Sequence, residues 1–254
     1  MLKGYYLIEL ETLIRHGRIR EGAIAFLESL QEEGFPYLII TEQSARSNEQ
    51  IASAMMQSGF SHVTYDQIYT GVMAAVDWMI MYEPQRSRAA YIGSAALRAT
   101  LERGGYIIDH RSPELLFTGL NRNMTYQEYS EALGYIMQGA ILISTDGRMR
   151  IRSEGVDQIG NGAIVKMLEA ASGETAEMFG RGSEKMMRMA LRYMQAPAHQ
   201  VIMVGSDFER DIVPALLMNM STVFVTEGNS IEDLGMSDQV HPDYIVETLY
   251  GLTK

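Results

Sequence analysis

Two groups of acidic residues in the sequence have a spacing that suits a reactive site. Glu9 and Glu11 follow one short apolar run, and Asp207, Glu209 and Asp211 follow another. A carboxylate can act as a nucleophile or can exchange a proton, and alternate residues of a strand point to the same side. From spacing alone, Glu9 and Glu11 are most simply two exposed, inert side chains at a strand end. A reactive carboxylate pair is the alternative.

The elements around Glu9 and Glu11 follow a strand and helix pattern. Residues 5–10 are typical of a buried strand, apolar residues recur at helical spacing over 22–31, and residues 35–41 indicate a second strand. A helix that connects two strands returns the chain in the same direction, so the second strand lies parallel to the first. This order predicts a parallel sheet. The next helix is expected over 48–59.

The end of the chain repeats this pattern. Helices are expected over 183–194 and 211–220, and strands over 201–204, 222–225 and 243–246. Strands that alternate with helices at both ends of the chain imply one α/β core. Open α/β sheets bind ligands at the carboxyl ends of their strands, so we expect the crevice there.

The middle of the chain has a strand and helix order of its own. Strands are expected over 89–93, 106–108 and 140–144, and helices over 94–104 and 125–139. A second small domain, inserted between two halves of the first, explains this order most simply.

Four segments in this order resemble motifs of the haloacid dehalogenase (HAD) superfamily, type IIA, the NagD-like or p-nitrophenylphosphatase-like group. They are residues 37–47, 160–165, 180–183 and 203–212. The resemblance covers essentially the whole chain. It implies an α/β fold with a doubly wound parallel-sheet core over 1–78 and 179–254, and an inserted α/β C2-type cap over 79–178.

The resemblance also implies a reaction. In this family an aspartate at the end of the first strand attacks phosphorus, and an aspartate two positions later serves as acid and base. This chain has Glu9 and Glu11 there, and each carboxylate is carried one methylene further out. A displacement of about 1 Å at a reacting atom can cost about 100-fold in rate. Ordinary phosphatase turnover is therefore not expected.

Other motif positions are kept or changed. Thr41 is retained and could hold a phosphoryl oxygen, Thr12 and Leu13 replace a Gly-Thr pair, and Arg181 replaces the motif lysine. An arginine keeps the charge but presents a planar fork. The implied catalytic residues are Glu9, Glu11, Thr41 and Arg181. They are expected to share one cleft with Ser206 and Asp211, where Arg181 could pair with Glu9, Glu11 or Asp211.

The implied metal site has also changed. The family's cofactor is Mg²⁺, and the implied ligands are Glu9, Ser206, Asp207 and Asp211. Ser206 replaces a metal-binding aspartate, and a hydroxyl is a poor substitute for a carboxylate in the octahedral shell of Mg²⁺. We expect Mg²⁺ binding to be weak or absent.

The implied substrate contacts come from two loops. They are Thr41, Glu42, Gln43, Thr145 and Asp146. Glu42 stands where the group usually has asparagine, which places a negative charge beside the anion site. The loop over 144–147 would set the substrate, and the sequence does not name one.

Three functions remain after these observations. The first is a phosphatase-like protein with impaired or lost hydrolysis, which serves as a binding or regulatory module instead. The second is a working Mg²⁺-dependent phosphoester hydrolase in which Glu9 attacks and Glu11 is the acid and base. The third is a structural homo-oligomer with no ligand. Whether the chain is an enzyme is left open.

Composition excludes several other classes of function. The chain has 254 residues, a net charge of −11 and no cysteine. The absence of cysteine excludes disulfides and thiolate metal sites, and the acidic balance argues against nucleic-acid or anionic-membrane partners. We find no signal pattern and no apolar run of membrane-spanning length, so we expect a cytoplasmic protein. The family resemblance implies a small phosphorylated metabolite as the partner if the chain is active, and homo-oligomerisation is left open.

Overall fold

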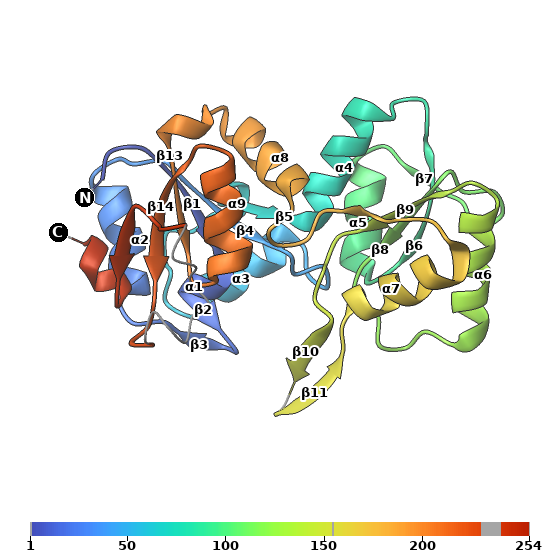
Figure 1. The fold of residues 1–254 in the computed structure, drawn as a ribbon, viewed down its shortest axis with the longest axis horizontal. Coiled ribbons are helices and arrows are strands. Elements are labelled where there is room, and N and C mark those ends of the chain that lie inside the picture. Colours follow the sequence, from blue (N-terminus) through green and yellow to red (C-terminus); the bar gives the residue numbers. More distant parts are fainter. Residues whose placement is uncertain (1, 154, 230–239, 254) are drawn as a thin grey trace. The chain divides into compact units, whose positions relative to one another are not determined.

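The computed structural model describes residues 2–153, 155–229 and 240–253 (Figure 1). The chain forms two compact units. Unit 1 consists of Met1–Thr41, Asn48–Tyr69 and Gly182–Lys254, and unit 2 consists of Glu42–Ser47 and Thr70–Arg181. Segments 42–47 and 70–78 thus belong to unit 2, and the predicted core and cap boundaries stay a prediction.

Unit 1 is built on a six-stranded sheet in the order β15-β14-β13-β1-β4-β5. Its strands are β1 (Tyr5–Glu9), β4 (Tyr37–Thr41), β5 (Ile68–Thr70), β13 (Val201–Gly205), β14 (Ser221–Val225) and β15 (Tyr244–Val246). The pairs of β1 with β4 and β13, of β13 with β14, and of β14 with β15 are parallel. The chain builds one half of the sheet, returns beside β1 and builds the other half. The predicted α/β fold with parallel sheets is confirmed.

The sheet of unit 1 is covered by amphipathic helices (Figure 1). The helical segments are α1 (Leu10–Leu13), α2 (Ala23–Glu32), α3 (Asn48–Gln57), α8 (Glu184–Met194), α9 (Val213–Leu217), a π-helical turn (Phe208–Ile212), and short 3-10 turns at Tyr65–Gln67, Ala198–Gln200 and Leu249–Leu252. Phe26 and Leu30 of α2 belong to the same fully buried cluster as Ile8, Ile39 and Val204 of the strands. Burial of these side chains stabilises the packing of α2 against the sheet.

A small hairpin follows α1. It consists of β2 (Ile14–Arg15) and β3 (Arg18–Ile19), which pair antiparallel. The turn between them places His16 and Gly17 at positive φ angles of 50° and 74°. The sequence analysis assigned no element to this stretch.

The predicted helix over 211–220 is wrong in its bounds. The chain forms the π-helical turn first, and α9 ends at Leu217. Within this turn the Asp211 side chain packs against Gly205, where a Cβ on the glycine would sit 2.3 Å from the Asp211 Cβ. Only a glycine fits this approach.

Unit 2 has a parallel five-stranded sheet in the order β12-β9-β8-β6-β7. Its strands are β6 (Arg88–Ile92), β7 (Ile107–Ile108), β8 (Leu115–Thr118), β9 (Ile141–Ser144) and β12 (Glu177–Met178), and its helices are α4 (Gly71–Tyr82), α5 (Ala95–Arg103), α6 (Tyr126–Met137) and α7 (Asn161–Ser172). An antiparallel hairpin of β10 (Arg150–Ser153) and β11 (Val156–Ile159) precedes α7. The buried core of unit 2 includes Leu116, Leu142 and Val165.

Helix α7 begins within the 160–165 motif segment, to which the sequence analysis assigned no helix. Its start is rich in glycine because two backbones meet there. A Cβ on Gly160 would lie 2.1 Å from the Arg148 carbonyl oxygen, and one on Gly162 would lie 2.4 Å from that of Gly147. The glycines therefore serve close packing of the helix start against residues 147–148.

Candidate active site

The first candidate residues lie at the end of β1 in unit 1. Glu9 is the last residue of the strand, is 1% exposed and is the N-cap of α1, where its Oε2 accepts the backbone N–H of Glu11 at 2.7 Å. The chain thus leaves the strand after Glu9. Glu11 is half-buried in the first turn of α1, so the strand alternation used in the sequence analysis does not extend to it.

Thr41 ends the neighbouring strand. It is the last residue of β4 and is 5% exposed. Strand β4 pairs with β1 in a register that sets Ile40 opposite Glu9. Thr41 and Glu9 therefore leave adjacent strands at the same edge of the sheet.

The end of β13 lies on the other side of β1. Ser206 follows this strand, and its hydroxyl accepts a hydrogen bond from the Thr12 hydroxyl at 3.2 Å. Asp211 is fully buried, and its Oδ2 accepts the backbone N–H groups of Ser206 and Asp207 at 3.0 Å each. The sheet therefore brings Glu9, Thr41 and the loop after β13 to one carboxyl edge.

Asp207 is held by a residue of its own turn. Its carboxylate accepts the backbone N–H of Arg210 at 3.0 Å, and the Arg210 Nε pairs with its Oδ2 at 3.0 Å. This side chain caps the π-helical turn.

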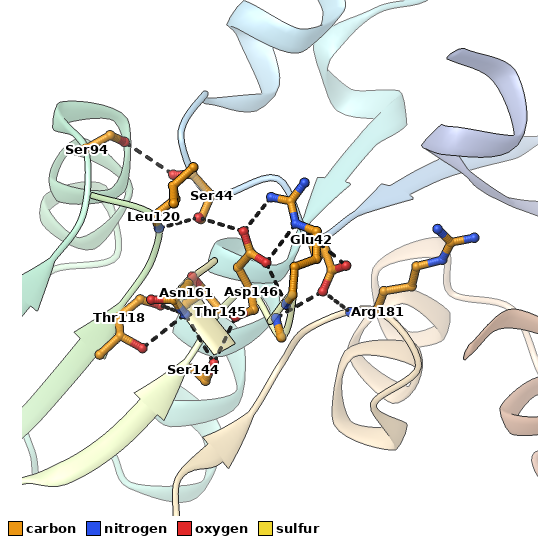
Figure 2. Close-up of polar contacts among 12 residues, drawn as sticks. Glu42, Ser44, Ser94, Thr118, Leu120, Ser144, Thr145, Asp146, Asn161 and Arg181 are labelled. Atoms are coloured by element: carbon orange, nitrogen blue, oxygen red, sulfur yellow. Dashed lines mark hydrogen bonds and ion pairs between the residues drawn. The ribbon is translucent and has the colours of Figure 1, made fainter. Parts of the chain in front are cut away.

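The second group of candidate residues forms a polar cluster in unit 2 (Figure 2). Glu42 is 5% exposed, and its Oε2 accepts the backbone N–H groups of Gly147 at 3.0 Å and Arg181 at 3.1 Å. Its Oε1 lies 3.9 Å from the Nε of Arg148. The backbone nitrogen of Arg181 faces Glu42, whereas its guanidinium extends away from it (Figure 2).

Asp146 is fully buried in the same cluster. Its two carboxylate oxygens take a two-pronged contact from Arg148, with Nε 2.9 Å from Oδ1 and Nη2 2.5 Å from Oδ2. Its Oδ2 also accepts the Ser44 hydroxyl at 3.4 Å, and Ser44 in turn accepts the N–H of Leu120 at 2.9 Å. One guanidinium thus contacts two buried carboxylates, those of Glu42 and Asp146, which limits their mutual repulsion.

Hydrogen bonds from an asparagine of α7 hold the loop that carries Asp146. Asn161 is 1% exposed, and its Nδ2 donates to the Asp146 carbonyl oxygen at 2.8 Å and to the Ser144 hydroxyl at 3.3 Å. The Thr145 hydroxyl donates to the carbonyl oxygen of Thr118 at 2.8 Å. Thr145 and Asp146 are therefore bonded within unit 2, and Gln43 is half-buried beside Glu42 in the chain.

Comparisons with known proteins place these sites in a family. The family model described as haloacid dehalogenase-like hydrolase matches residues 11–107, and the HAD-hydrolase-like model matches 178–252. The chain is 26% identical over 248 residues to the 5'-nucleotidase YutF of Bacillus subtilis, covering 97% of this chain and 96% of that protein. It is 26% identical over 246 residues to an acid sugar phosphatase of Staphylococcus aureus, covering 96% and 94%.

A solved structure agrees with these matches. NagD from E. coli K-12 has a TM-score of 0.89 with this chain at 23% identity, and the similarity covers 98% of each chain. The chain belongs to the haloacid dehalogenase superfamily. A thermostable p-nitrophenylphosphatase of Bacillus stearothermophilus is 26% identical to this chain with a TM-score of 0.87, over 98% of this chain and 97% of that one. Within the superfamily, the chain belongs to the NagD-like, p-nitrophenylphosphatase-like type IIA group, and the two curated relatives are a 5'-nucleotidase and an acid sugar phosphatase by name.

Phosphatases of the HAD superfamily use Mg²⁺, which binds oxygen ligands in an octahedral arrangement. The side chains at the carboxyl edge of unit 1 would have to supply these ligands. Within 2–153, 155–229 and 240–253, no group of three or more His, Cys, Asp and Glu side chains is arranged to hold a metal. Asp211 accepts two backbone amides, Asp207 is paired with Arg210, and Ser206 supplies only a hydroxyl. This set does not fit the octahedral oxygen shell of Mg²⁺.

The structure describes the predicted site residues only within each unit. Glu9 and Thr41 end β1 and β4, and Ser206 and Asp211 follow β13 in the same sheet. That they form one site stays a prediction. Arg181 belongs to unit 2, so its predicted approach to that edge stays a prediction.

Sequence reasoning missed Arg148, Ser44 and Asn161. The available signal for Arg148 was its position two residues after Asp146, with only Gly147 between them. An acidic and a basic residue on either side of a glycine can form an ion pair when the glycine allows a tight turn.

Proposed function

We propose that this chain is a HAD phosphatase-like protein whose phosphoester hydrolysis is impaired or lost. The proposal rests on three motif positions, where Glu9, Glu11 and Ser206 replace aspartates. A protein of this kind can still bind a small phosphorylated metabolite, because Thr41 and the strand-end edge are retained.

The observation that carries the proposal is the hydrogen bond of Glu9. Its Oε2 caps α1 by accepting the N–H of Glu11 at 2.7 Å, in a side chain that is 1% exposed. A nucleophilic carboxylate must reach phosphorus with an oxygen in line, within about 3–3.5 Å. The extra methylene and the capping bond together turn the Glu9 carboxylate toward its own backbone.

The loop after β13 supports the same proposal. Asp211 holds the backbone of Ser206 and Asp207, and Thr12 holds the Ser206 hydroxyl. These contacts keep the loop folded through the protein's own groups. The fold therefore does not depend on an ion to bring the strand ends together.

A working hydrolase that uses Glu9 as nucleophile is the alternative. The relatives favour it, because they are a 5'-nucleotidase and an acid sugar phosphatase by name. It requires Glu9 to exchange its capping bond for contact with a phosphoryl group. No step through Mg²⁺ is derived, because the residues at the edge do not fit that ion.

Among the predicted substrate contacts, we favour Thr41 over Glu42 and Asp146. The two carboxylates contact Arg148 and backbone N–H groups, so they are committed within unit 2. No helix in the described part of the chain is long and apolar enough to cross a membrane. A cytoplasmic location and the absence of nucleic-acid and membrane partners stay predictions, and homo-oligomerisation stays open.

The proposal is tested by hydrolysis of p-nitrophenyl phosphate with Mg²⁺ present. We expect a rate at least ~100-fold below that of a family member with intact aspartates, because the nucleophile is displaced. Ordinary enzyme activity that disappears in Glu9→Gln would establish the alternative function instead.

A further inference from the structure

The five-stranded sheet of unit 2 has a place of its own where a ligand could bind. From β6 the chain builds the sheet to one side, with β7, and from β8 it builds the other side, with β9 and β12. In open α/β sheets, ligands bind outside the carboxyl ends of the two strands between which the order reverses. In unit 2 these ends are Ile92 of β6 and Thr118 of β8.

Ser44 fills this place and is bonded beyond both strand ends (Figure 2). It is 1% exposed, its carbonyl oxygen accepts the Ser94 hydroxyl at 3.2 Å, and its own hydroxyl accepts the Leu120 N–H at 2.9 Å. Ser94 lies two residues after β6, and Leu120 lies two residues after β8. A Cβ on Gly119 would lie 2.9 Å from the Ser44 hydroxyl oxygen, so only a glycine admits Ser44 here. Ser44 therefore occupies the position of a bound ligand.

Glu42 anchors the same segment at a second place. Its Oε2 accepts the N–H groups of Gly147 and Arg181, which follow β9 and β12 in the chain. This oxygen is closely enclosed, because a Cβ on Gly180 would lie 2.9 Å from it. Segment 42–47 is thus bonded beyond the carboxyl ends of four strands of one sheet.

Both anchors come directly after the end of β4. The register of β4 with β1 ends at Ile40, and Thr41 is the next residue. The direction in which the backbone leaves Thr41 is therefore set by the segment that Glu42 and Ser44 hold. Thr41 is the phosphoryl contact in the proposed function, on which the role of the segment rests. We propose that segment 42–47 is an internal ligand of the unit 2 sheet, and that Ser44 and Glu42 are positioning residues for Thr41.

The anchoring is tested by amide hydrogen exchange of the full chain, followed by NMR. Ser44→Ala removes the buried hydroxyl, and Ser130→Ala is the matched control, because the exposed Ser130 hydroxyl donates to the Tyr126 carbonyl oxygen of its own helix. We expect Ser44→Ala to speed exchange of the Arg181 N–H about 10-fold, although that N–H is bonded to Glu42, because the segment is released as a unit. Ser130→Ala should leave this rate unchanged.

The amide of Leu142 in β9 reports opening of the whole unit and is the reference within each variant. If Ser44→Ala does not fold, Glu42→Gln gives the reciprocal measurement. It weakens the second anchor and should speed exchange of the Leu120 N–H, which is bonded to Ser44. A distant amide that speeds up no more than Leu142 would overturn the anchoring.

The effect on Thr41 is measured by titration with inorganic phosphate. A displaced Thr41 loses a hydrogen bond to a charged group, so Ser44→Ala should weaken phosphate binding about 10-fold. Ser130→Ala should leave the affinity within about twofold. Unchanged affinity in Ser44→Ala would overturn the positioning role.

A wild-type protein that binds no phosphate would contradict the binding part of the proposed function, and the amide signal of Thr41 then decides the positioning role. We expect this signal to shift in Ser44→Ala and to stay in place in Ser130→Ala. A Thr41 signal that does not move in Ser44→Ala would overturn the positioning role without reference to phosphate.

Discussion

The two units of this protein hold their buried carboxylates in different ways. In unit 1, Glu9 and Asp211 accept backbone N–H groups and so organise a helix start and a loop. In unit 2, Glu42 and Asp146 also contact one arginine, Arg148. Acidic residues at motif positions therefore need not face a ligand. The buried pair in unit 1 is held by backbone N–H groups, and the buried pair in unit 2 is held by backbone N–H groups together with one arginine.

The largest expected effect is that of removing Arg148. Arg148→Ala leaves the buried carboxylates of Glu42 and Asp146 without the cation that contacts both, and should lower the free energy of unfolding by about 3–5 kcal/mol. Urea unfolding followed by circular dichroism measures it. Arg98→Ala is the matched control, because the Arg98–Glu102 pair is exposed and should contribute little.

A second set of variants asks whether the loss comes from uncompensated charge. Combining Arg148→Met with Glu42→Gln and Asp146→Asn should recover much of the stability, because no buried charge is then left unpaired. If Arg148→Ala unfolds at the same urea concentration as Arg98→Ala, the cluster is not an ion-pair core and the contrast between the units fails.

A buried tyrosine in each unit gives a smaller, matched comparison. The Tyr6 hydroxyl of unit 1 donates to the Leu2 carbonyl oxygen at 2.6 Å, whereas the Tyr106 hydroxyl of unit 2 has no hydrogen-bond partner. Tyr6→Phe should therefore cost about 1 kcal/mol, and Tyr106→Phe should cost nothing or stabilise. Thermal unfolding of both variants decides this, and equal losses would contradict it.

The same tyrosines predict a loss of stability at high pH. Burial raises the pKa of both Tyr6 and Tyr106 to about 12 from an ordinary value of 10.0. Because the unfolded chain releases these protons first, their contribution is complete below pH 10 and is lost as the pH rises toward 12. Each Tyr→Phe variant should reduce this slope. A stability that is flat over that pH range in the wild type would show that the burial has no such effect.

The smallest expected effect is that of Mg²⁺ on the wild-type protein. Since Asp207 and Asp211 are bonded within their own loop and Ser206 is not a carboxylate, millimolar Mg²⁺ should not shift the thermal transition in a saturable way. Ser206→Asp should increase the response. A saturable micromolar site in the wild type would mean that the loop after β13 rearranges to bind the ion.

Much of the fold follows from local pattern. The strands that end at Glu9, Thr41 and Gly205 are apolar runs, and the helices between them have a clear apolar stripe, so periodicity finds them. Helix α4 was missed because it is apolar on most of its surface and carries no such stripe, and α7 was missed because its glycines resemble a loop.

The chemistry of the site is less visible in the sequence. The motif spacing places Glu9 and Thr41 at strand ends, but it does not reveal that Glu9 caps α1 or that Asp211 binds two backbone amides. The contact of Glu42 with Arg148 joins residues more than a hundred positions apart. Such pairing depends on the folded backbone, and spacing alone cannot supply it.

The central claim is that altered placement of carboxylates limits this member of the HAD superfamily. Its most direct test is the triple variant Glu9→Asp, Glu11→Asp and Ser206→Asp, assayed for p-nitrophenyl phosphate hydrolysis beside the wild type. We expect the triple variant to be at least ~100-fold faster, with little gain from any single change, because residues that act as a unit are not additive. A triple variant slower than the wild type would contradict the account and identify Glu9 and Glu11 as an adapted catalytic pair.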